Sequence, residues 1–344
     1  MKKFVTLREA EKFSQKKINK KTFNWLQSGA EDDYTYKKNF EDLRRIQIKP
    51  FHLNKVRNID LKCDFLGNKI ASPIILSPMG HQTQFHKDGE IEMGKGINNV
   101  DTIAFFSTQG RISLDDIRKK NKNLKLGWTI FPFGNKEWIK KEVTSAMKNK
   151  CVAIAICIDA NVRSHRYQDR ESRYDARLKG RRTNPLPPDP SYALKYDWSL
   201  IAYIKKLTKI PIIVKGVLTS SDMKNAIKFG CDAVWISNHG GRMFNSGISS
   251  VDAILEIKNK LKNRKKIKVI VDGGIRKGSD VIKFLCLGAD FVGIGRPALH
   301  GLIYSGSKGV SEVFKILNSE LKTNMINGGF KKEISFNMKR LNFL

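Results

Sequence analysis

The chain has 344 residues and a formal net charge of +31, because 64 Lys and Arg outnumber 33 Asp and Glu. No apolar run is long enough for a membrane span, and charged residues follow the basic start, so we expect neither a membrane span nor a signal peptide. A nucleic acid would suit the charge, but the lysines are spread along the whole chain without a basic tail or an aromatic RNA-binding signature. We therefore expect no specific nucleic-acid partner and a preference for small anionic substrates.

The cysteines indicate the redox setting. Five of them, at positions 63, 151, 157, 231 and 286, are scattered and show no CxxC spacing. Most lie in or beside apolar segments, so we expect reduced thiols in a cytoplasmic protein. The chain also lacks a zinc motif, and we expect no metal site.

The predicted elements begin with a helical extension over residues 1–69, with helices at 7–17 and 22–28. Eight short apolar runs then predict buried strands: residues 73–76, 102–106, 124–130, 153–158, 211–214, 233–236, 268–271 and 291–294. Helical signals separate several of these strands, at residues 137–147, 198–207, 220–229 and 279–287. A glycine follows each of the last two segments, Gly230 after 220–229 and Gly288 after 279–287, which is typical of helix C-termini.

Eight buried strands alternating with helices predict a parallel (β/α)8 TIM barrel of the α/β class. We expect the barrel to occupy residues 70–330, with a C-terminal tail at 331–344. Residues 160–198 are irregular and contain a proline-rich run at 185–190. We expect this segment to form a mobile loop over the mouth of the barrel.

Polar residues follow four of the predicted strands. Residues 237–242 read Ser-Asn-His-Gly-Gly-Arg, 272–276 read Asp-Gly-Gly-Ile-Arg, and 295–297 read Gly-Arg-Pro, while Lys215 and Gly216 follow residues 211–214. The carboxyl ends of barrel strands form the active-site face, and the last two loops commonly hold a phosphate. His239 suits proton transfer near neutral pH, although a histidine at a strand end is also a common structural residue.

These blocks, together with Ser-Gly-Ala-Glu-Asp-Asp at 28–33, resemble the FMN-dependent 2-hydroxy acid oxidases and dehydrogenases, the group of glycolate oxidase, lactate oxidase and flavin-linked lactate dehydrogenase. The resemblance covers residues 22–329. It implies FMN as cofactor, a homotetramer, and oxidation of a 2-hydroxy acid to a 2-oxo acid. The electron acceptor stays open.

The resemblance also implies a role for each residue of the site. His239 takes the substrate proton while a hydride equivalent passes to flavin N5, and Asp159 stabilises the charged imidazole. Arg166 and Arg242 hold the substrate carboxylate. The remaining residues bind the cofactor: Lys215 near flavin N1; Met79, Gly80 and Ser107 at the isoalloxazine; and Asp272, Gly273, Arg276, Gly295 and Arg296 at the ribityl chain and phosphate.

The chemistry of the ligands supports these assignments independently. A fixed carboxylate suits two guanidiniums, and a phosphate suits glycine N–H groups and arginines. Two alternatives stay open at this point: Asp159 as a loop cap, and Arg166 as a solvated charge beside the arginines at 163, 170 and 173.

The chain departs from the family pattern at five aligned positions. Tyrosines of the N-terminal helix and the third strand align with Trp25 and Ile130, and a flavin-contacting glutamine aligns with Trp128, with a register uncertain by one residue. A threonine aligns with Cys157, and an aromatic residue aligns with Gln109.

These departures predict a more apolar pocket and a substrate other than glycolate or lactate, such as a larger or aromatic 2-hydroxy acid or a modified-peptide carbinol. Two alternatives remain. One is another FMN barrel enzyme, an isomerase or a decarboxylase-like enzyme. The other is a flavin-binding protein that has lost catalysis.

Overall fold

A closed barrel of parallel strands forms the centre of the computed structural model, which describes all residues except 1–2, 54, 177–178, 187–194, 261–266 and 332–335. Around the barrel the strands follow the order β10-β11-β4-β5-β6-β7-β8-β9. Their bounds are β4 Ile74–Leu76, β5 Ile103–Ser107, β6 Lys125–Ile130, β7 Ala153–Cys157, β8 Ile212–Val217, β9 Ala233–Ile236, β10 Lys268–Val271 and β11 Phe291–Ile294. The predicted TIM barrel is confirmed.

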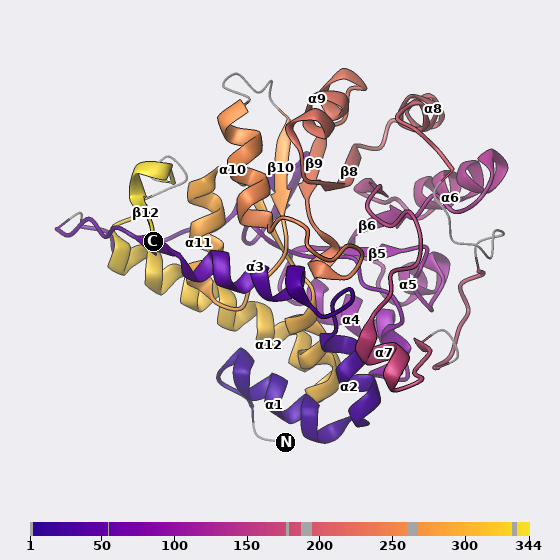
Figure 1. The fold of residues 1–344 in the computed structure, drawn as a ribbon, viewed down its shortest axis with the longest axis horizontal. Helices are drawn as coiled ribbons and strands as arrows, with labels where there is room; N and C mark the ends of the chain where they lie inside the picture. Colours follow the sequence, from indigo (N-terminus) through magenta and orange to yellow (C-terminus); the bar gives the residue numbers. More distant parts are fainter. Residues whose placement is uncertain (1–2, 54, 177–178, 187–194, 261–266, 332–335) are drawn as a thin grey trace.

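Helices surround the barrel (Figure 1). They are α4 Gly89–Asn98, α5 Leu114–Lys120, α6 Lys136–Lys148, α8 Ser199–Leu207, α9 Ser220–Lys228, α10 Ser250–Lys260, α11 Gly278–Leu287 and α12 Arg296–Gly328, the last interrupted at Ser305 and Gly306. The helices predicted at 137–147, 198–207, 220–229 and 279–287 correspond to α6, α8, α9 and α11. Part of the proline-rich run, residues 187–190, lies outside the described residues.

The N-terminal extension contains α1 Leu7–Lys17, α2 Lys20–Gln27 and α3 Tyr34–Arg44. Thr6 caps α1 through a bond from the Glu9 N–H, which explains why the helix begins where the sequence predicts. α1 packs against α12 (Figure 1), with Phe4 and Phe13 on the ring of Tyr304. Near the C-terminus, β12 Leu341–Phe343 follows the short turn η5 Met338–Arg340 and pairs antiparallel with β1 Ile46–Ile48.

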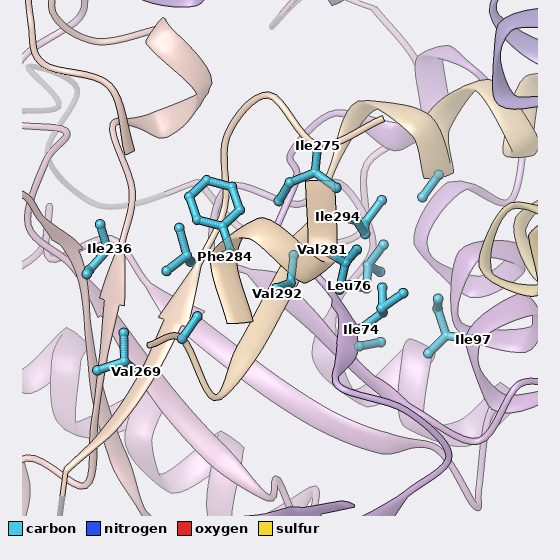
Figure 2. Close-up of a cluster of buried hydrophobic side chains, with 14 of the residues drawn as sticks. Ile74, Leu76, Ile97, Ile236, Val269, Ile275, Val281, Phe284, Val292 and Ile294 are labelled. Carbon is cyan, nitrogen blue, oxygen red and sulfur yellow. The ribbon is translucent and has the colours of Figure 1, made fainter. Parts of the chain in front are cut away.

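Two hydrophobic layers hold the barrel. Outward strand residues pack against the helices, as Figure 2 shows for β4, β10 and β11 against Val281 and Phe284 of α11. Inward residues fill the interior, among them Phe105 and Trp235, whose rings meet edge to face at 5.1 Å between centroids. This alternation places successive residues of each strand in different environments.

A hairpin closes the amino-terminal end of the barrel. It consists of β2 Cys63–Phe65 and β3 Asn68–Ile70, which pair antiparallel. Phe65 is fully buried, and its ring centroid lies 4.8 Å from that of Phe291 and 6.1 Å from that of Phe105. This end of the barrel is therefore sealed with aromatic side chains, and the opposite end carries the polar residues.

Replacing Phe65 with Ala tests this seal. The change leaves a cavity among buried rings, so we expect the free energy of unfolding to fall by about 3–5 kcal/mol. Urea denaturation measures the loss, with Phe343→Ala as the control because Phe343 is exposed. A loss no larger than that of the control would contradict the packing described here.

Candidate active site

A cavity opens at the carboxyl ends of the barrel strands. Residues that follow the strands line it together with Trp25 and Leu26 of α2 and with the loop after β7, including Ala160, Val162, Arg163, Arg166, Asp175 and Ala176. Except for Asp159, every site residue expected from the sequence lies in its wall: Met79, Gly80, Arg166, Ser107, Lys215, His239, Arg242, Asp272, Gly273, Arg276, Gly295 and Arg296. The loop also contains an unpredicted helix, α7 Tyr167–Glu171.

His239 and Asp159 form a pair beside the cavity. Nδ1 of His239 lies 3.1 Å from Oδ1 of Asp159, which is almost completely enclosed, while its second oxygen has no hydrogen-bond partner among the described residues. Burial alone would favour the protonated carboxyl, but the charges of His239 and Lys215 hold the pKa of Asp159 at about 2. Asp159 is therefore an ionised partner of the imidazole, and not a loop cap.

The backbone fixes the position of His239. This residue has φ +58° and opens the short turn η3 His239–Gly241, and its N–H donates to Oγ of Ser237 at 3.1 Å. Asn238 accepts from the Gly241 N–H and exchanges hydrogen bonds with Asn39 of α3. The N-terminal extension thus helps to hold the imidazole at the cavity.

Lys215 is a buried cation on β8. Its Nζ donates to Oγ of Ser237 at 2.6 Å and lies 3.3 Å from Oδ2 of Asp272, which also accepts from Oγ of Ser77. Burial opposes the charge, but Asp272 and Asp159 raise the pKa of Lys215 above its ordinary value. The ammonium group is therefore charged.

Arg166 and Arg242 lie on the same side of the cavity. Nη1 of Arg242 donates to the carbonyls of Trp25 and Ser28, and Arg166 pairs with Asp169 at 3.3 Å and with Ser164. Burial and the charge of Arg166 lower the pKa of Arg242 well below its ordinary value. Among the described residues, Nε and Nη2 of Arg242 and Nη2 of Arg166 have no hydrogen-bond partner, and they are available to an anion.

Another part of the cavity wall combines glycines with Arg276 and Arg296, and Arg296 lies beside Arg242, because both donate to the Ser28 carbonyl. Gly273 and Gly274 have φ of +109° and +77°, and a Cβ on Gly274 would meet the Asn39 carbonyl at 2.6 Å. α12 has no side-chain cap at Gly295; because Pro297 has no N–H and the Ala298 N–H donates to the Gly295 carbonyl, the backbone N–H of Arg296 is the donor that the start of this helix offers. Arg296 donates to the carbonyls of Leu26, Gly240 and Ser28.

The predicted contribution of Trp128 and Ile130 to the pocket is wrong. Both side chains face outward into the layer between barrel and helices, where Nε1 of Trp128 donates to Glu142 of α6 at 3.0 Å. Thr129 lies on the other face of the strand and is buried, and Phe131 and Phe133, beyond the strand, line the cavity. The register differs by one residue from the alignment, and in a strand one residue exchanges the two faces.

Several cavity residues were not predicted from the sequence: His81, Phe131, Phe133, Arg163 and Asp175. His81 follows Met79 and Gly80, so its place directly after a strand end was the available signal. Phe131 stands 5.8 Å from His239, between ring centroids, and an apolar run continuing past a strand end could have indicated this position.

A family model described as FMN-dependent dehydrogenase matches residues 14–342. The chain belongs to this family. 2-Hydroxyacid oxidase 1 of Mus musculus is 29% identical over 347 residues, covering 95% of this chain and 93% of the relative. L-lactate oxidase of Streptococcus iniae is 30% identical over 334 residues, covering 93% and 81%.

Solved structures agree with this assignment. A lactate oxidase of Pediococcus acidilactici has a TM-score of 0.90 at 29% identity, covering 100% of this chain and 96% of that chain. A mandelate oxidase with a TM-score of 0.91 at 23% identity shows the shared fold. This FMN-dependent dehydrogenase is therefore an oxidoreductase acting on CH–OH groups, with FMN as its cofactor. Within the described residues, no helix has both the length and the apolar character of a membrane span.

The cavity fits FMN on chemical grounds. Oγ of Ser107, Nε2 of Gln109 and Oγ1 of Thr129 are buried without a hydrogen-bond partner among the described residues, as expected where a polar ring edge binds. The glycine backbone, the backbone N–H of Arg296 and the positive charges of Arg276 and Arg296 match a phosphate.

The ionised state of Asp159 gives a pH prediction. Because its folded-state pKa lies below the ordinary value of 3.8, the carboxylate stabilises the native state above about pH 4. That contribution, about 2 kcal/mol, is lost as the pH falls toward 2. Urea unfolding of the wild type and Asp159→Asn across this range is expected to show their difference narrowing below about pH 4. A difference independent of pH would contradict the ionised state.

Proposed function

We propose that this FMN-dependent dehydrogenase oxidises a 2-hydroxy acid to a 2-oxo acid, with His239 as the base. The observation that carries the proposal is the convergence of the His239–Asp159 pair with two incompletely paired guanidiniums on one cavity. A bound FMN would supply the two-electron acceptor for the hydride equivalent that leaves the substrate carbon.

The residues of the chain bind the substrate, orient it and accept its proton. The free N–H groups of Arg166 and Arg242 bind the substrate carboxylate and orient the carbon that is oxidised. His239 removes the proton, and the charge of Asp159 stabilises the resulting imidazolium. Lys215 would place its positive charge beside the bound ring, where it would stabilise negative charge that the ring gains on reduction.

The other assigned residues hold the cofactor. Met79, Gly80 and Ser107 would contact the ring, and Asp272 would act through Lys215 and Ser77. Gly273, Arg276, Gly295 and Arg296 would hold the ribityl chain and the phosphate. The charge and glycine content of that part of the cavity wall support this placement.

The wall of the cavity favours an apolar substrate side chain. Phe131 and Phe133 cluster with Ala160 and Met243, and Trp25 stacks on Phe85 with 5.9 Å between ring centroids. A small polar substrate would leave much of this surface in contact with water. We therefore propose a larger apolar or aromatic 2-hydroxy acid.

An anaerobic titration tests the proposed reaction. FMN-loaded protein is mixed with a panel of 2-hydroxy acids with small, branched and aromatic side chains, and the flavin absorbance is followed. Bleaching is expected, and strongest with the larger apolar substrates. If no member bleaches the flavin, the oxidation proposed here is contradicted.

Replacing His239 with Asn tests the base. We expect the turnover number to fall by about 10²–10⁴-fold while FMN remains bound, because the imidazole handles the substrate proton and not the cofactor. Steady-state kinetics and the flavin spectrum measure the two effects, and His52→Gln at an exposed position is the control. Unchanged turnover would remove His239 from this role.

A further inference from the structure

His81 lines the cavity in a position that the proposed chemistry leaves unused. It follows β4 with φ +59°, and its ring stands edge-on to Trp25 with 5.7 Å between centroids. Nε of Arg111 donates to Nδ1 of His81 at 3.3 Å. The imidazole is thus held from one side and faces the cavity with the other.

The contact with Arg111 fixes the tautomer. A guanidinium has no acceptor, so Nδ1 of His81 must present a lone pair and the ring proton must lie on Nε2. Arg111 is itself buried and immobilised, donating to the carbonyls of Ala176 at 2.7 Å and Gly180 at 3.3 Å. Its backbone N–H donates to Glu90 at 2.8 Å.

His81 is also electrically neutral. Burial, together with the charges of Arg111, Arg182, Arg242 and Arg166, lowers its pKa to about 3. The ring of Trp25 contacts both His81 and Arg242, whose guanidinium carbon lies 4.9 Å from the Trp25 ring centroid, and His81, Arg166 and Arg242 all line the same cavity. Nε2 has no hydrogen-bond partner among the described residues, so a neutral donor stands unused beside these guanidiniums.

We propose that Nε2–H of His81 donates a hydrogen bond to the substrate carboxylate and so acts as a third anchor beside Arg166 and Arg242. Arg111 is the positioning residue, since it reaches the substrate only through the imidazole. This inference rests on the proposed function, because it assigns His81 to the substrate and not to the cofactor. A neutral donor adds a directional contact without adding charge to an already cationic cavity.

The test measures binding of oxalate, a small dianion with two adjacent carboxylates, to the FMN-loaded protein by isothermal calorimetry. The informative pair is His81→Asn and His81→Gln. The Gln amide nitrogen can take the place of Nε2, whereas the shorter Asn amide reaches only the place of Nδ1. Asn also tolerates the left-handed backbone at this position, so His81→Asn separates loss of the donor from backbone strain.

We expect His81→Asn to weaken oxalate binding by about ten-fold or more, the effect of losing one hydrogen bond to a charged group. His81→Gln and the exposed control His52→Gln are expected to bind nearly as the wild type does. FMN affinity, measured by fluorescence titration, is expected to be unchanged in all three.

Other outcomes overturn the inference. Wild-type oxalate affinity in His81→Asn would show that Nε2–H is not an anchor, and a selective loss of FMN affinity would assign the residue to the cofactor. If the wild type neither binds oxalate nor is reduced by any 2-hydroxy acid, the proposed function itself fails. If a 2-hydroxy acid reduces the wild-type flavin but His81→Asn binds oxalate as tightly as the wild type does, the inference about His81 is refuted and the proposed function stands.

Discussion

The concentration of buried positive charge at one end of a barrel is the constraint on which this site depends. Arg166, Arg242, Arg296 and Lys215 are all largely enclosed around one cavity, and burial together with neighbouring guanidiniums lowers the pKa of Arg242 and brings that of Arg296 to about 10. Desolvated cations of like sign are costly unless anions compensate them. A phosphate and a carboxylate bound in this cavity would provide that compensation, and the same cations would then select these ligands.

The rest of the fold makes such a cavity possible. The carbonyls of Trp25 and Leu26 in α2, and of Ser28 just after it, accept from Arg242 and Arg296, so the N-terminal extension serves as one wall of the site. At the opposite end, the hairpin that carries Phe65 seals the barrel with packed rings. The cations and the His239–Asp159 pair therefore lie at the end of the barrel that the hairpin leaves open to polar ligands.

Much of this arrangement could be predicted from the sequence. Buried strands that are followed by glycine and charged residues can be recognised from the local sequence. The order of the strands in a barrel then brings His239, Lys215 and Asp272 together. The face of β6 could not be predicted, because Leu126, Trp128 and Ile130 would pack on either side of a strand buried on both. The outward face of Trp128 is stabilised by a residue distant in the sequence, Glu142 of α6, which accepts a hydrogen bond from the indole of Trp128. The contact between His81 and Arg111 could not be predicted either, because the two residues are 30 positions apart in the chain and only the fold brings them together.

The most direct measurement is a crystal structure of the protein with FMN and oxalate bound. We expect the phosphate at Arg276 and the start of α12, the flavin ring beside Lys215, and oxalate between His239 and the guanidiniums of Arg166 and Arg242. Oxalate bound away from these three side chains, or a flavin ring excluded from the space beside Lys215, would contradict the central claim that one cationic cavity holds both anions.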